Sequence, residues 1–68
     1  MSPFAVPDAP NITVGETYKI RNDPTDEFVV VTAVWWRTAP PRAWLVDVLR
    51  LSGKFETYNP GALYQPKR

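Results

Sequence analysis

Cysteine and histidine are both absent from this chain of 68 residues. Their absence excludes disulfides, metal sites built on thiolates or imidazoles, and nucleophile–base pairs of the Ser-His or Cys-His kind. At this length we expect one small domain with a marginal hydrophobic core. Self-association, or docking onto a larger protein, is the support that remains for such a core.

Motifs for phosphate binding and acid–base catalysis are lacking as well. The three glycines are isolated, so the chain has no glycine-rich phosphate loop. The acids Asp23, Asp26 and Glu27 fall together in a turn-rich stretch, where solvated capping residues are typical. We therefore expect a protein that is not an enzyme, with no catalytic residue, metal site, cofactor or small-molecule substrate.

Long apolar runs are missing too, since none approaches the roughly 20 residues that a membrane-spanning helix needs. The N-terminal stretch has neither the basic region nor the apolar segment of a secretory signal. These absences predict a protein without a membrane partner, located in the cytoplasm or associated with a virion.

Charge of either sign is modest in total but uneven along the chain. The net charge is +1, which is too small for a general electrostatic attraction to phosphates. Up to Trp36 there are two basic and five acidic residues, and from Arg37 onward six basic and two acidic. The second half of the chain is therefore the part that could approach an anionic partner.

Proline is abundant, with eight residues, and three of them fall in the first ten positions. Proline removes backbone donors and biases its neighbours toward extended conformations, so residues 1–14 are expected to form an extended N-terminal arm. Phe4 and Val6 are apolar enough to lie against a surface. The sequence leaves open whether the arm binds its own domain or another molecule.

The first two predicted strands precede the middle of the chain. Tyr18 and Ile20 alternate with polar neighbours, which predicts a strand within residues 15–21. Turn-forming residues follow, and a second strand is expected from about Glu27 to Trp36. Valine, phenylalanine and tryptophan dominate this second stretch, which favours a strand over a helix.

The remaining elements follow in quick succession. Pro40 and Pro41 interrupt the ladder and predict a stiff hairpin loop before a third strand at residues 43–51. Ser52–Gly53 is expected to form a two-residue turn into a fourth strand at residues 54–59. Asn59 then caps a single 3-10 turn, and residues 64–65 form a brief fifth strand.

The second strand is unusual because it is apolar on both faces. Its smaller side chains suit the crowded interior of a small barrel, so we expect Val29, Val31 and Ala33 to point inward. Trp35 and Trp36 are adjacent and must face opposite ways. At least one of the three tryptophans is therefore expected near the surface or under the N-terminal arm.

This order of elements resembles that of small SH3-like barrels, including the Tudor and KOW types. The resemblance covers residues 15–65 and implies an all-β antiparallel SH3-like barrel of four to five strands, with one short 3-10 turn near the C-terminus. Residues 1–14 would be the arm and residues 66–68 a C-terminal tail. The resemblance rests on architecture and implies no particular activity. The alternatives are an open four-stranded sheet and an OB-like barrel, although this stretch is short for the latter.

The leading functional prediction is a non-catalytic interaction module that self-associates or docks onto a larger protein assembly. Tryptophan and arginine dominate protein–protein hot spots, and the hairpin and the arm together supply the predicted interface. Its residues are Phe4, Val6, Trp35, Trp36, Arg37, Pro40, Pro41, Arg42 and Trp44. A short, proline-armed chain without cysteine also fits a phage or mobile-element protein.

The alternative prediction is a nucleic-acid-binding domain. Aromatic side chains can stack on bases while basic side chains contact phosphates. The residues predicted for this role are Trp36, Arg37, Arg42, Arg50, Lys54 and Tyr58. The near-neutral total charge argues against it, so a protein partner or a second copy of the chain is preferred.

Overall fold

The structure is a computed structural model, and it describes residues 6–66. It is an all-β domain of five antiparallel strands with one 3-10 turn, which confirms the predicted fold class. The elements in chain order are β1 (Thr17–Ile20), β2 (Val29–Arg37), β3 (Ala43–Arg50), β4 (Phe55–Tyr58), η1 (Pro60–Ala62) and β5 (Leu63–Tyr64).

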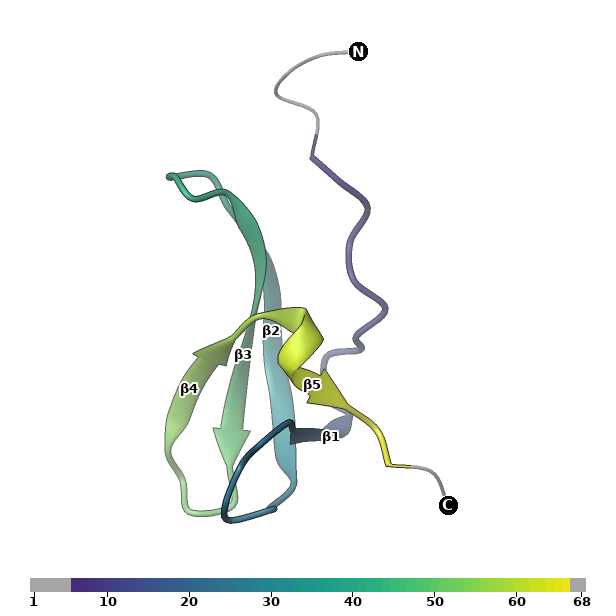
Figure 1. The fold of residues 1–68 in the computed structure, drawn as a ribbon, viewed down its shortest axis with the longest axis vertical. Helices are drawn as coiled ribbons and strands as arrows, with labels where there is room; N and C mark the ends of the chain where they lie inside the picture. The colour runs from purple at the N-terminus through teal and green to yellow at the C-terminus, as the bar shows by residue number, and fades with distance from the viewer. Residues whose placement is uncertain (1–5, 67–68) are drawn as a thin grey trace.

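The strands form one sheet in the order β4-β3-β2-β1-β5 (Figure 1). Each predicted strand is present close to its predicted bounds. The 3-10 turn carries the chain from one edge strand, β4, to the other, β5, across the face of the sheet. In the part of the chain that the structure describes, no ladder joins β4 to β5, so the sheet stays open between its two edges and is not closed into the predicted barrel.

The core lies on one face of this sheet. Alternate residues of each strand point to the same side, and the residues of this side are the most buried of the domain. Val46 and Val48 are fully buried in β3, and Val29 and Val31 are 1% exposed in β2. The other buried core residues are Tyr18, Ile20 and Leu63.

A β-bulge in β2 changes which residues share the core face. Val31 lies opposite Val48, but the next paired residue, Ala33, lies opposite Asp47, so Thr32 is one extra residue in this strand. The Thr32 hydroxyl donates to the Asp47 backbone carbonyl at 3.2 Å. The bulge turns Val34 onto the core face, where it packs against the buried cluster.

The prediction that Ala33 points inward is therefore wrong, because it assumed an uninterrupted period of two. Ala33 shares the outer face with its cross-strand partner Asp47. Val29 and Val31, which precede the bulge, do point inward as predicted.

Two turns differ from their predicted form. The hairpin between β3 and β4 is closed by the pair Arg50 N–H to Lys54 carbonyl at 2.9 Å, so its loop has three residues, 51–53, instead of two. Gly53 supplies the positive φ of 90° that ends such a loop. Asn59 stands at the N-cap of η1 but makes no side-chain hydrogen bond there.

The outer half of the β2–β3 hairpin extends beyond the rest of the sheet. β1 pairs with β2 only at Val29 and Val30, and β4 pairs with β3 only from Val46 onward. Among the described strands, residues 35–37 and 43–45 therefore pair only with each other. In Figure 1 this two-stranded ribbon rises above the other strands and ends in the proline-containing loop.

Within residues 6–66, no helix is long and apolar enough to cross a membrane.

Candidate interaction surface

The two faces of the hairpin ribbon carry different aromatic side chains. Trp36 lies directly opposite Trp44, and Trp35 lies directly opposite Leu45. Because neighbouring residues of a strand alternate, the first pair lies on one face and the second pair on the other. The adjacent tryptophans do point in opposite directions, as the sequence predicted.

The face of Trp36 and Trp44 is met by the N-terminal arm. The two indole rings are in edge-to-face contact, with centroids 5.6 Å apart and planes at 62°. The Trp44 indole N–H donates to the Pro7 carbonyl at 3.0 Å, across 37 positions of sequence. At Pro7 the arm thus folds back onto its own hairpin. The sequence had left open whether the arm contacts its own domain or another molecule.

The arm is fixed to the domain more firmly further along the chain. Ile12 packs against the core cluster, and the Thr13 N–H donates to the hydroxyl of the buried Tyr18 at 3.0 Å. The Gly15 N–H then donates to the Val31 carbonyl at 2.8 Å. Residues 12–15 are therefore an anchored segment, whereas one side-chain hydrogen bond holds the arm at Pro7.

Other predicted interface residues lie at exposed positions. Trp35 is 40% exposed and Val6 is 52% exposed. The Pro40–Pro41 peptide bond is cis, and the Arg37 side chain donates from Nε to the Ala39 carbonyl at 3.2 Å and from a terminal nitrogen to the Pro40 carbonyl at 3.5 Å. The hairpin loop is thereby tied to the end of β2.

The remaining predicted interface residues are Arg42 and Phe4. Arg42 is exposed at the end of the loop, next to the start of β3. Phe4 lies outside the described residues. The structure thus brings Trp36, Trp44 and the arm together and presents Trp35 on the opposite face.

A second cluster of polar side chains surrounds Arg50 at the far end of β3. One terminal nitrogen of its guanidinium donates to Asp23 at 3.0 Å and to Glu27 at 2.8 Å. The other donates to the Tyr58 hydroxyl at 2.9 Å, and Nε donates to Glu56. This guanidinium therefore joins the β1–β2 loop, where Asp23 and Glu27 lie, to strand β4.

The cluster is internally hydrogen-bonded as well. The Tyr58 hydroxyl donates to Glu56 at 2.6 Å. Asp23 accepts from the Thr25 hydroxyl at 2.9 Å and from the Thr25 backbone N–H at 3.3 Å, which closes a local turn in the loop. The Arg50 side chain is only 12% exposed.

The ion pairs shift the pKa values of these groups. Hydrogen bonds from Tyr58 and then from Arg50 lower the pKa of Glu56, and the same contact with Glu56 raises the pKa of Tyr58. Desolvation alone would raise the pKa of Asp23, but the hydrogen bonds from Thr25 and Arg50 outweigh it and lower this pKa. Asp23 and Glu56 are thus held in their charged form and the Tyr58 phenol in its neutral form.

This geometry makes Arg50 a link between a loop and the sheet edge. The sequence placed Arg50 and Tyr58 among residues that contact nucleic acid, whereas in the fold they bind each other and nearby carboxylates. No sequence signal marked this cluster, because its members come from a loop, from β3 and from β4. Within residues 6–66, no group of three or more acidic side chains is placed to hold a metal ion.

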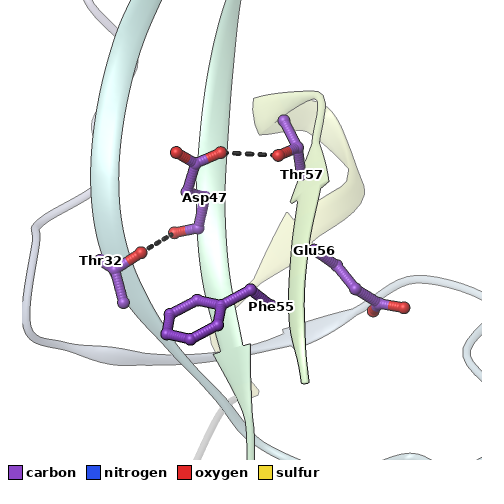
Figure 2. A pocket seen from close by; sticks show the side chains of 5 residues that line it. All are labelled: Thr32, Asp47, Phe55, Glu56 and Thr57. Carbon is purple, nitrogen blue, oxygen red and sulfur yellow. Dashed lines mark hydrogen bonds between the residues drawn. The ribbon is translucent and has the colours of Figure 1, made fainter. Parts of the chain in front are cut away.

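The outer face of the sheet carries an open pocket of about 370 Å³. Thr32, Asp47, Phe55, Glu56 and Thr57 line it (Figure 2). The Asp47 carboxylate accepts a hydrogen bond of 2.6 Å from the Thr57 hydroxyl. The bulge brings Thr32 to the rim of this pocket. Sequence reasoning singled out none of these residues as a site on this face.

Comparison of the chain with protein-family models, with curated proteins and with solved structures finds no match.

Proposed function

We propose that this protein is a non-catalytic interaction module that binds a second copy of itself, or a larger protein assembly, through the β2–β3 hairpin and the N-terminal arm. The observation that carries the proposal is the ribbon of residues 35–37 and 43–45, beside which residues 6–66 place no further strand. A two-stranded ribbon is marginally stable by itself in water. A partner that covers it supplies the missing contacts.

The exposed face of the ribbon is the part that a partner would cover. Trp35, which is 40% exposed, lies opposite Leu45 on this face. Large aromatic side chains of this kind anchor many protein interfaces. The arm already contacts the other face through Pro7 and Trp44, so the two sides of the ribbon have different roles.

Sedimentation velocity at several concentrations tests this proposal, with Trp35→Ser as the variant. Phe28→Ser is the matched control, because Phe28 is 43% exposed and lies outside the ribbon. We expect the full chain to associate as its concentration rises, or to bind an isolated partner. Trp35→Ser should weaken that association about tenfold or more, as expected for a hot-spot residue, while Phe28→Ser leaves it unchanged.

Deletion of residues 1–9 separates the contribution of the arm, since it spares the anchored residues 12–15. A changed mass in solution after this deletion would support an arm that contributes to the interface. A chain that stays monomeric at tens of micromolar and captures no partner would contradict the proposal.

We infer in addition that the domain is SH3-like. The strand order β4-β3-β2-β1-β5 and the 3-10 turn between β4 and β5 support this architecture. The composition of the chain would fit a phage or mobile-element protein, including a virion component.

Nucleic-acid binding is the second candidate function. It is favoured by the hairpin loop, where Arg37 and Arg42 lie close in sequence to the Trp36–Trp44 pair. Lys54, however, lies in the β3–β4 turn, at the opposite end of the sheet from that loop (Figure 1). The basic side chains therefore do not form one continuous surface for a nucleic-acid backbone.

A salt titration tests this candidate with tryptophan fluorescence and a single-stranded oligonucleotide. Phosphate contacts must weaken steeply as salt increases, and Arg37→Ala should flatten that slope. Binding that does not depend on salt, or no binding at low salt, would exclude this function in favour of the protein interface.

A further inference from the structure

Asp47 is the charged residue of β3 that faces away from the core, and its position is chemically unusual. It lies between the fully buried Val46 and Val48, so its side chain projects from the outer face. Leu45 and Leu49 flank it on the same face of β3. This carboxylate therefore stands in a largely apolar part of the sheet surface.

Four other acids close to the sheet have cationic partners, and Glu16, just before β1, accepts from the Gln65 side-chain amide at 3.2 Å. Asp23, Glu27 and Glu56 bind Arg50, and Asp26 binds Lys19 at 3.1 Å. In the described part of the chain, no lysine or arginine forms an ion pair with Asp47 at the distances found for these acids. Its Oδ1 accepts the Thr57 hydroxyl hydrogen bond, and its Oδ2 carries no hydrogen bond within the described residues.

The side chains around Asp47 suit a flat cation. Figure 2 shows the Phe55 ring reaching across β3 toward Thr32, while Glu56 points away from Asp47. Phe55 is 69% exposed, so its ring is accessible to a ligand. An aromatic face attracts cations, and the hydroxyl oxygen of Thr57 adds an acceptor next to the carboxylate.

A guanidinium group matches this arrangement better than an ammonium group. It has five donors in a planar fork, it stacks on aromatic rings, and it is weakly hydrated. One edge can donate to the free oxygen of Asp47 and to the Thr57 hydroxyl while the plane rests on Phe55. Any partner that covers this apolar face would have to desolvate Asp47, and a guanidinium compensates that cost.

We propose that the pocket of Asp47, Phe55 and Thr57 binds an arginine side chain of a protein partner. This site goes beyond the hairpin and arm interface, because it lies on a different part of the sheet and uses none of the tryptophans. It also gives the acid on the outer face a role, and Thr32, the extra residue of the bulge in β2, is among the residues that line the pocket.

The test is an NMR titration of the ¹⁵N-labelled full chain with N-acetyl-arginine methylamide. Its uncharged analogue, N-acetyl-citrulline methylamide, has a similar shape and serves as the ligand control. We expect saturable shifts at the amides of Thr32, Asp47, Phe55 and Thr57 with the arginine probe only. Asp47→Asn, whose amide oxygen can still accept from Thr57, should weaken binding about threefold to tenfold.

Two further variants sharpen the result. Phe55→Leu should also weaken binding, and since Phe55 is largely exposed, the fold should be unchanged. Asp26→Asn removes the same charge from a distant exposed acid and should leave the affinity as it is. The amide spectrum of each variant verifies that it is folded.

Several outcomes would overturn the proposal. Equal shifts with the citrulline analogue would mean that the positive charge is not recognised. Equal affinity of Asp47→Asn, shifts confined to other surfaces, or no shifts at millimolar probe would each exclude an arginine site at this pocket. These outcomes leave the hairpin interface unaffected, because its test uses Trp35 and the arm.

Discussion

The bulge at Thr32 decides how substitutions of Ala33 and Val34 should change the stability of the domain. In the structure Val34 lies on the core face and Ala33 on the outer face. Exchanging them, in the double variant Ala33→Val and Val34→Ala, keeps the composition unchanged. If the bulge is present, this exchange removes two methyl groups from the core and adds them to the surface.

The expected cost follows from the buried apolar surface. Two buried methylene equivalents contribute about 1.6 kcal/mol at about 0.8 kcal/mol each. Val34 is half-buried, which reduces this figure, whereas the space left behind adds to the cost, so we expect Val34→Ala to destabilise by about 1–2 kcal/mol. Ala33→Val should change stability by less than about 0.5 kcal/mol, since it is a surface substitution in a strand.

Thermal and urea unfolding, followed by circular dichroism, measure both single variants and the exchange. For a domain of this size each kcal/mol shifts the midpoint by about 4–8 °C, so the exchange should lower it by about 4–16 °C. An uninterrupted strand would put Ala33 inward and Val34 outward. In that case Val34→Ala would be nearly neutral and Ala33→Val would destabilise by overpacking, and this reversed order would refute the bulge.

Three other predictions concern the Arg50 cluster and the arm. The pKa values of Asp23 and Glu56 are lowered in the fold, so these carboxylates stabilise it above the ordinary carboxyl pKa and lose that contribution as pH falls through the lower folded value. The unfolding midpoint should therefore drop in acid, and Arg50→Gln should make the midpoint depend less on pH. Arg50→Lys should lower the midpoint by several degrees at pH 7, because one ammonium cannot reproduce the contacts of a guanidinium fork, and an unchanged midpoint would show that the cluster is not needed to hold the loop. Trp44→Phe removes the indole donor that binds the Pro7 carbonyl, so NMR order parameters of residues 6–9 should fall while the free energy of unfolding changes by about 1 kcal/mol or less. Unchanged order parameters would mean that other contacts hold the arm.

The sequence was sufficient to predict the strands because their signals are local. Tyr18 and Ile20 alternate with polar residues, and the proline pair at 40–41 and Gly53 mark the loops. Period-two reasoning also placed Val29 and Val31 correctly. The same reasoning failed at Ala33 because a bulge inserts one residue, and no residue type near Thr32 indicates a bulge.

The side-chain clusters were less predictable because they depend on long-range pairing. Asp23 and Glu27 precede Arg50 by more than twenty positions, and only the return of β3 beside β2 brings that side chain to their loop. The outer pocket likewise depends on the register that sets Asp47 opposite Thr57. The residue types indicate which interactions each side chain can make. Which side chains come into contact depends on the register of the sheet.

Strand β2 is therefore apolar on both faces for two different reasons, one on each side of the bulge. Before the bulge, its inner face belongs to the core. Beyond the rest of the sheet, Trp36 lies on the face that the arm meets at Trp44, whereas Trp35 is left exposed on the other face. The described part of the arm meets this ribbon on the Trp44 face, which is not the face of Trp35. Trp35 is thus the residue through which the proposed partner would shield the second face of this strand from water.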